Sequence, residues 1–427
     1  MKKIRHFILF AFLTGFCFVS GQDQPVVDEY LHSRSDIVSI EEVTADSVFL
    51  KAWLLFVEQP LDHDDPDKGS FTQRVWLSHR AEDAPMVLIN EGYMAPRNYS
   101  AELAELLEAN QVIVEHRYFG ESVPDSVQWK YLTIEQAAKD HHRIVEMLKE
   151  IYREKWVNMG VSKGGQAAMI HRALFPGDVD VTVSYVAPFN LEKEDERLIR
   201  FFDQVGTSKQ RERIFEFQKE VLKRKEELMP LFRELAEARE YTYRMGMERA
   251  FELVVLEYPF SLWQWCGPVD QIPSPDSPAE ELFDHLQQAS DFEYFSDQLW
   301  DDIGPFFYQA YNELGYYPYL ASPVKPWLNE IEADTVSNKF MAPEAGTLSF
   351  NDKAPSRILH RLKEIDPEMI VITGENDPWS ATSIETEGFN NVLKVEKPGG
   401  CHNTRISNLP DSLRQEVINK LEQWLEK

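Results

Sequence analysis

The stretch of residues 156–166, W-V-N-M-G-V-S-K-G-G-Q, limits the fold of this chain more than any other. An apolar run ends at Gly160 and a helical pattern begins at Gln166, with Gly-x-Ser-x-Gly between them. This spacing builds a sharp strand-to-helix turn with Ser162 at its tip, where the hydroxyl lies near the positive end of a helix. Ser162 is therefore predicted to be a nucleophile. The alternative is an ordinary Gly-rich turn that ends in a serine.

The size and charge of the chain exclude one class of function. With 427 residues and 43% hydrophobic content, the chain can bury a large core, either as one domain with a big insertion or as two domains. Its formal net charge of -28 would repel nucleic acid, so no nucleic-acid partner is expected. Such acidity usually means a well-solvated surface, and it also attracts cationic peptides or free amino termini.

The amino-terminal residues have the pattern of a secretory signal peptide. Three basic residues in the first five precede an apolar run over 7–19, and small residues follow at Ser20 and Gly21. We therefore expect residues 1–21 to be a signal peptide, and the protein to be exported to the periplasm or the extracellular space. The run is too short for a comfortable membrane span, and no other stretch is long and apolar enough.

Two cysteines remain once the predicted signal peptide is removed, Cys266 and Cys401. In an exported protein such a pair can form a disulfide. Two buried free thiols are the alternative. The sequence leaves both possibilities open.

Apolar runs and helical patterns alternate along much of the chain. Buried strands are expected at 85–90, 111–115, 156–160, 179–187, 369–373 and 392–396, with helices at 101–108, 134–151, 356–365 and 413–425. This alternation predicts a parallel α/β sheet. Between 191 and 348 helical patterns and aromatic residues dominate instead. We expect an α/β core in two parts, 22–190 and 349–427, interrupted by a helical cap insertion over 191–348.

Two polar residues follow the last two predicted strands. Asp377 comes after the strand at 369–373, and His402 after the strand at 392–396. Functional groups gather past the carboxyl ends of strands in open α/β sheets. Taken alone, Asp377 could be a turn aspartate and His402 a surface histidine. The order Ser162, Asp377, His402 is that of the α/β-hydrolase fold, so we predict this fold with a large helical cap insertion.

The three residues predict acyl transfer through a covalent intermediate. Ser162 would attack a carbonyl carbon, and His402 would take the serine proton and later give it to the leaving group. Asp377 would fix the imidazole tautomer and stabilise the imidazolium. No cofactor is needed for this chemistry. No metal is expected either, because the acidic segment 62–67 lacks the glycine that a calcium loop requires at its sixth position.

The oxyanion formed in this reaction needs backbone donors. One donor should be the N–H of Lys163, the residue after the nucleophile. The other should come from the loop after the strand at 85–90, so from Gly92 or Tyr93. The Lys163 side chain is not needed for this role.

Several long segments resemble known serine peptidases. The sequence is similar to the secreted bacterial tripeptidyl aminopeptidase family, related to prolyl peptidases, at 160–165, 171–172, 175–180, 185–188, 200–203, 259–264 and 374–379. Segments 59–63 and 115–122 resemble the sister family of lysosomal Pro-X carboxypeptidase and dipeptidyl peptidase II. The resemblance runs from about 50 to 405. It implies Ser162, Asp377 and His402 as the triad of a serine exopeptidase with a helical cap, often favouring Pro beside the scissile bond.

Four further side chains are candidates for substrate binding. Glu91, in the predicted oxyanion loop, could hold a substrate α-ammonium, or could be a structural carboxylate bonded to loop N–H groups. Glu375 is the second candidate for that role. Arg117 would pair with one of these two or with a buried acid. Trp263 and Trp265 would line an apolar pocket or belong to the core of the cap.

The sequence thus predicts a secreted serine exopeptidase that acts on peptide substrates. It would release short peptides, tripeptides in the first instance, from free amino termini, with Pro at the cleavage site as a family preference. An esterase or lipase on the same fold is one alternative, since fold and triad alone do not choose the substrate. A non-catalytic surface binding protein that has kept the fold is another. Nothing in the sequence gives the oligomeric state.

Overall fold

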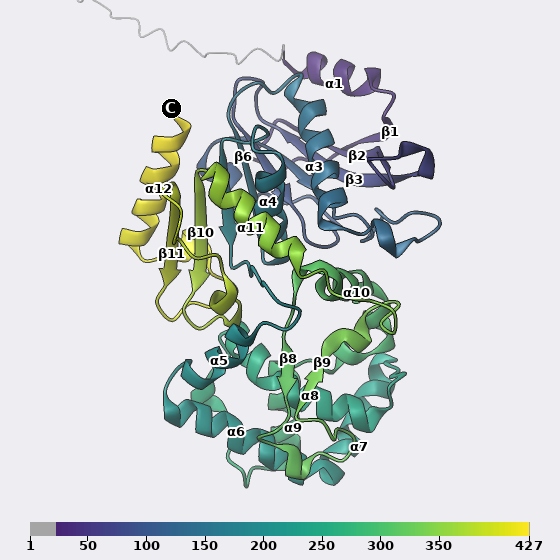
Figure 1. Ribbon diagram of the computed structural model, residues 1–427, viewed down its shortest axis with the longest axis vertical. Coiled ribbons are helices and arrows are strands. Elements are labelled where there is room, and N and C mark those ends of the chain that lie inside the picture. Colours follow the sequence, from purple (N-terminus) through teal and green to yellow (C-terminus); the bar gives the residue numbers. More distant parts are fainter. Residues whose placement is uncertain (1–22, 427) are drawn as a thin grey trace, which may run out of the picture.

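The structure is a computed structural model that describes residues 23–426. The predicted signal peptide over 1–21 lies outside the described residues. Figure 1 shows a sheet flanked by helices in the upper part of the molecule and a largely helical body below it. Within residues 23–426, none of the helices combines the length and the apolar character that a membrane crossing requires.

The described residues form a nine-stranded sheet in the order β1-β2-β3-β5-β4-β6-β7-β10-β11. Its antiparallel edge consists of β1 (Ile37–Val43), β2 (Lys51–Pro60) and β3 (Ser70–His79). The parallel part consists of β4 (Met86–Asn90), β5 (Asn110–Val114), β6 (Trp156–Val161), β7 (Val181–Tyr185), β10 (Met369–Gly374) and β11 (Val392–Lys397). Strands β4, β5, β7 and β10 are buried along their whole length, which explains the apolar runs of β4 and β10.

Helices cover both faces of this sheet. On one face lie α3 (Ile134–Lys149), α4 (Lys163–Leu174) and α11 (Lys353–Ile365), which pack side by side with α4 in the middle (Figure 1). On the other face α2 (Glu102–Leu106) and α12 (Asp411–Leu425) share a hydrophobic core with the strands. A short amino-terminal helix, α1 (Asp23–Ser33), packs near β1. The predicted α/β-hydrolase fold is confirmed.

A helical segment lies between β7 and β10 in the sequence. Its longer helices are α5 (Glu196–Gln204), α6 (Ser208–Lys223), α7 (Lys225–Arg239), α8 (Met247–Gln264), α9 (Ala279–Ala289) and α10 (Asp297–Gln309). A small antiparallel pair, β8 (Pro318–Leu320) and β9 (Thr335–Ser337), accompanies them. The segment has an aromatic-rich core of its own, and Figure 1 places it beyond the carboxyl ends of β10 and β11. Helices α5 and α8 contact the short turn η8 (Pro378–Thr382) that follows β10.

A buried ion pair joins the middle of α3 to the loop after β5. Arg117 is fully buried, and its guanidinium donates to both Asp140 carboxylate oxygens, at 2.6 and 2.7 Å. It also donates to the carbonyls of Leu61 and Tyr131, at 3.0 and 2.7 Å. Of the partners that the sequence left open for Arg117, the structure thus selects a buried acid. Burial alone would raise the pKa of Asp140, but the charge and hydrogen bonds of Arg117 outweigh it and hold that pKa below its usual value.

The Arg117–Asp140 pair should be essential to stability. Asp140→Asn leaves a buried guanidinium without its counter-charge, so we expect a loss of about 3–5 kcal/mol in the free energy of unfolding. Because the folded-state pKa of Asp140 is depressed, its contribution is full above the unfolded pKa of about 4 and disappears as the pH falls. Urea denaturation of wild type and variant at several pH values measures both effects.

Asp64→Asn is the matched control, because the exposed Asp64 pairs with Lys139 at the surface. Such a pair contributes at most about 1 kcal/mol. Equal losses in the two variants would contradict the role of the buried pair.

Candidate active site

Ser162 stands at the junction of β6 and α4 in an unusual backbone conformation. Its φ is 56° and its ψ is -126°, a region that non-glycine residues rarely adopt. The Ser162 N–H donates to the Tyr185 carbonyl of the neighbouring strand at 2.8 Å. The side chain is half-buried and remains reachable. This is the strand–turn–helix geometry that presents a serine hydroxyl above a sheet.

Three glycines around Ser162 permit this turn. A Cβ at Gly160 would lie 2.1 Å from the carbonyl carbon and oxygen of Gly164. At Gly164 it would lie 2.5 Å from the Asn90 carbonyl oxygen, and at Gly165 it would lie 2.8 Å from the Ala187 Cβ. Only glycine fits at these positions, so α4 begins in direct contact with β6 and with the end of β4.

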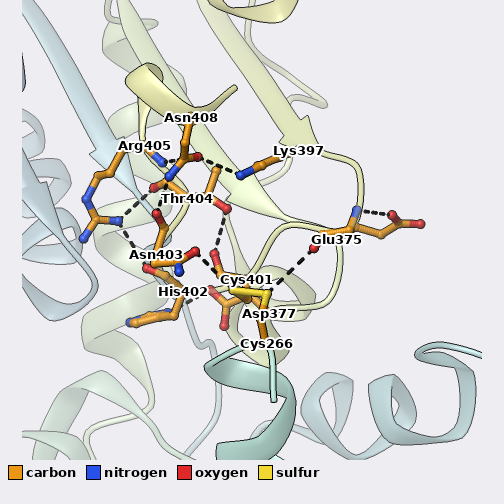
Figure 2. Close-up of a disulfide and its surroundings, with 11 residues drawn as sticks. Cys266, Glu375, Asp377, Lys397, Cys401, His402, Asn403, Thr404, Arg405 and Asn408 are labelled. Atoms are coloured by element: carbon orange, nitrogen blue, oxygen red, sulfur yellow. Dashed lines mark hydrogen bonds and ion pairs between the residues drawn. A yellow bond between two sulfur atoms is a disulfide. The ribbon is translucent and has the colours of Figure 1, made fainter. Parts of the chain in front are cut away.

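Asp377 and His402 meet beyond the carboxyl ends of β10 and β11. The Asp377 Oδ2 lies 2.8 Å from the His402 Nδ1, and Asp377 is fully buried (Figure 2). The Asp377 Oδ1 accepts a hydrogen bond from the Trp379 N–H at 3.2 Å, which fixes the carboxylate. Nδ1–H donation to the carboxylate leaves Nε2 as the basic nitrogen of the ring. Strands β6, β7, β10 and β11 are parallel neighbours in the sheet, so Ser162, which follows β6, lies at the same carboxyl end of the strands.

A disulfide ties the His402 loop to the helical segment. Cys266, just past the end of α8, pairs with Cys401, and their Cα atoms are 5.6 Å apart (Figure 2). The His402 N–H also donates to the Gln264 carbonyl of α8 at 2.9 Å. Of the two states that the sequence allowed for these cysteines, the structure has the disulfide. The position of His402 therefore depends on α8 as well as on β11.

The loop after β4 lies against the first turn of α4. A Cβ on Gly92 would lie 2.6 Å from the Gly164 nitrogen and 2.8 Å from the Lys163 Cβ, so the two backbones are in close contact. The Tyr93 carbonyl accepts from the His116 N–H at 3.1 Å. Within residues 23–426, the N–H groups of Lys163, Gly92 and Tyr93 donate to no backbone carbonyl. All three predicted oxyanion donors thus have free N–H groups, and Gly92 lies against the first turn of α4.

The two predicted amine-binding carboxylates differ in their surroundings. Glu91 is half-buried and accepts a hydrogen bond from the Tyr99 hydroxyl at 2.7 Å, and burial raises its pKa. Glu375 is exposed, accepts from the Gly399 N–H at 2.7 Å, and points away from His402 in Figure 2. Glu375 therefore links the loop after β10 to the loop after β11, which is a structural role. Glu91 lies in the predicted oxyanion loop.

The two predicted pocket tryptophans also differ. Trp263 is buried inside the helical segment, where it lines an apolar cavity of about 340 Å³. Trp265 is 58% exposed, and its ring centre lies 5.5 Å from that of His402 in an edge-on arrangement. Of these two tryptophans, only Trp265 lies against the Asp377–His402 pair.

Aromatic residues that were not among the predicted site residues join the helical segment to the site. Phe306 lies 5.6 Å from Tyr93 between ring centres, and Tyr316 lies 5.6 Å from Trp379. The aromatic enrichment of 191–348 was visible in the sequence, but which rings face the core strands depends on tertiary packing. Glu257 was missed too. It accepts hydrogen bonds from Ser261 and Tyr317, and burial raises its pKa to about 7.

The described residues contain no group of three or more His, Cys, Asp or Glu side chains arranged to hold a metal ion. The polar groups near the carboxyl ends of β6, β10 and β11 are instead a serine, an imidazole, a carboxylate and free N–H groups. These groups suit nucleophilic attack on a carbonyl.

Comparisons with known proteins point to one family. The model of the PS-10 peptidase S37 family matches residues 26–425. The prolyl tri/tetrapeptidyl aminopeptidase of Streptomyces mobaraensis is 30% identical over 380 residues, which are 86% of this chain and 78% of that protein. The lysosomal Pro-X carboxypeptidase of Bos taurus is 28% identical over 202 residues, 42% of this chain and 40% of the relative. Among solved structures, the proline iminopeptidase of Mycobacterium smegmatis matches with a TM-score of 0.45 and 15% identity, covering 87% of this chain and 98% of that one.

The contact between Gly92 and α4 gives a direct test of the site. Gly92→Ala forces a Cβ against backbone and moves the loop away from Ser162. If this loop supplies an oxyanion donor, we expect the rate at which a fluorophosphonate labels Ser162 to fall about 10²–10³-fold. Gly177→Ala is the control, because a Cβ there meets nothing within 4 Å. Unchanged labelling of Gly92→Ala would exclude the loop from the site.

Proposed function

The chain belongs to the PS-10 peptidase S37 family and is a serine peptidase, and on that premise we propose that Ser162, His402 and Asp377 are its catalytic triad. The observation that carries the proposal is the 2.8 Å contact between Asp377 Oδ2 and His402 Nδ1, at the sheet edge where the strained turn presents Ser162. We further propose that the enzyme is exported and releases short peptides from free amino termini, with tripeptides as the main product.

The proposed mechanism runs through an acyl-enzyme. His402 Nε2 takes the proton of the Ser162 hydroxyl while Oγ attacks the scissile carbonyl carbon. The carbonyl oxygen becomes an oxyanion between the N–H groups of Lys163 and Tyr93. Collapse breaks the C–N bond, and the leaving amine receives the proton from His402. Water then repeats the attack on the acyl-enzyme ester, releases the peptide acid and returns the proton to Ser162.

The helical segment 191–348 is proposed to cap the site. Its rings pack on both loops that flank the triad, through Phe306 on Tyr93 and Tyr316 on Trp379. The Cys266–Cys401 disulfide joins it covalently to the His402 loop. A cap fixed in this way would close one end of the cleft, which supports an exopeptidase over an endopeptidase. The disulfide also supports export, since such bonds persist in oxidising compartments.

Glu91 is the proposed partner of the substrate α-ammonium. It lies one residue before Gly92 in the proposed oxyanion loop, and among residues 23–426 its side chain has one hydrogen-bond partner, the Tyr99 hydroxyl. Its raised pKa reflects a carboxylate that is desolvated without a cation, a state that a bound ammonium would relieve. Glu375 is not proposed for this role, because it faces Gly399 and away from His402.

Loss of either the nucleophile or the base should abolish turnover without unfolding the protein. We expect Ser162→Ala and His402→Ala each to lower kcat by roughly 10⁴–10⁶ on a peptide with a chromogenic leaving group. His360→Ala is the control, because His360 is an exposed histidine on α11 that pairs with Glu364 at the surface. Near-wild-type turnover by Ser162→Ala would disprove the assignment.

The requirement for a free amino terminus can be measured with paired substrates. A short peptide with Pro before the chromophore is compared with its acetylated twin. Acetylation would leave the Glu91 carboxylate desolvated and unpaired, which should cost about 3–5 kcal/mol of binding free energy. We therefore expect kcat/KM to fall roughly 10²–10³-fold or more. Glu91→Gln should remove most of this difference, whereas Glu375→Gln should preserve it. Equal turnover of the twins by wild type would rule out the exopeptidase and leave an endopeptidase or esterase.

A further inference from the structure

The Lys163 side chain is buried in an unusual setting. It is only 3% exposed, and no carboxylate among residues 23–426 forms an ion pair with it. Its Nζ lies over the rings of Tyr93 and Phe119, at 5.4 and 4.8 Å from their centres. Burial lowers the pKa of Lys163 well below its ordinary value. Lysines are almost never buried without a counter-charge, because desolvating the amine costs stability.

Among the described residues, the Lys163 amine forms one hydrogen bond, to the loop after β4. Lys163 Nζ donates to the Gly92 carbonyl oxygen. An amine donates this bond in either protonation state, so the bond survives the lowered pKa. The lysine thus reaches back from the first turn of α4 and holds the neighbouring loop by its backbone.

The Gly92 carbonyl and the Tyr93 N–H belong to the same peptide unit. The described residues contain no cis peptide bond, so this unit is trans and its carbonyl and N–H point in opposite directions. Holding the carbonyl towards the buried Nζ therefore turns the Tyr93 N–H to the other side. Glycine on one side of a peptide lowers the barrier to flipping it, so this orientation needs a restraint.

We propose that Lys163 is a positioning residue for the oxyanion hole. Its side chain fixes the Gly92–Tyr93 peptide so that the Tyr93 N–H faces the developing oxyanion. The inference rests on the proposed function and assigns a task to a side chain for which the sequence analysis required none. One residue would then supply the first donor through its own N–H and aim the second through its amine.

A purely structural role for Lys163 makes a different prediction. Its aliphatic stem and the rings of Tyr93 and Phe119 form an apolar contact that a methionine can replace at similar length. His116 and His141 line a small cavity with Lys163, and burial lowers the pKa of both. Both imidazoles are therefore neutral, so Lys163→Met leaves no buried charge without its partner. The substitution removes the hydrogen bond to Gly92 and preserves most of the packing.

The test compares Lys163→Met, Lys163→Arg and wild type on a chromogenic peptide. We expect Lys163→Met to lower kcat about 10²-fold, the effect of one oxyanion donor, with KM unchanged. A peptide boronate, which forms a tetrahedral adduct with Ser162, should lose affinity by the same factor. Inhibition by the released product peptide, which forms no oxyanion, should not change. Lys163→Arg keeps a donor and should recover at least about a tenth of wild-type kcat.

The outcomes separate this inference from the proposed function. If Ser162→Ala is inactive but Lys163→Met has wild-type kcat, only the role of Lys163 is overturned. Equal losses in boronate and product affinity would also overturn it, because they would mean a deformed pocket. If Lys163→Met does not fold, the kcat of Lys163→Arg is compared with that of Gly92→Ala instead. Because the arginine keeps a donor, a kcat as low as that of Gly92→Ala, with both far below wild type, would overturn the role of Lys163. Turnover by Ser162→Ala would instead disprove the proposed function itself.

Discussion

The close approach of α4 to β6 and to the end of β4 is the contact on which the site depends. It exists because Gly160 and Gly164 present no side chain, so backbone meets backbone at distances that a Cβ would not allow. This contact fixes Ser162 in its strained conformation, because β6 on one side and α4 on the other leave the turn no room to relax. It also brings Gly92 against the first turn of α4. Ser162, the proposed nucleophile, and the loop that carries the proposed oxyanion donors are therefore positioned by the same backbone packing.

The Asp377–His402 pair, the proposed acid and base, depends on a second set of restraints. Asp377 caps η8, which contacts α5 and α8, and His402 lies in the loop after β11. The Cys266–Cys401 disulfide and the bond from the His402 N–H to Gln264 connect that loop to the end of α8. Since α8 lies more than a hundred residues before His402 in the chain, the imidazole is placed by tertiary contacts as much as by its own strand.

Buried polar groups in this molecule fall into two kinds. The Arg117–Asp140 pair is satisfied on every side, with carbonyls and a carboxylate around the guanidinium, and it serves the fold. Lys163 and Glu91 lie beside the site, and neither has an ion-pair partner within the described residues. Desolvated groups without a counter-charge cost stability, and such groups concentrate where binding or chemistry uses them. The contrast supports functional roles for the two groups next to Gly92.

The sequence by itself determined the α/β-hydrolase fold, because alternating apolar runs, helical patterns and the Gly-x-Ser-x-Gly turn are local signals with local physical causes. The sequence also predicted that Asp377 follows β10 and that His402 follows β11, because the end of each strand is visible in its apolar pattern. Tertiary structure alone decided which partner each of those residues has. Cys266 forms a disulfide with Cys401, Glu375 accepts a hydrogen bond from the Gly399 N–H, and the Lys163 amine donates to the Gly92 carbonyl. Each of these pairings joins residues that are far apart in the chain. The distance between two loops in the folded protein depends on tertiary packing, so no local periodicity or spacing in the sequence predicts it.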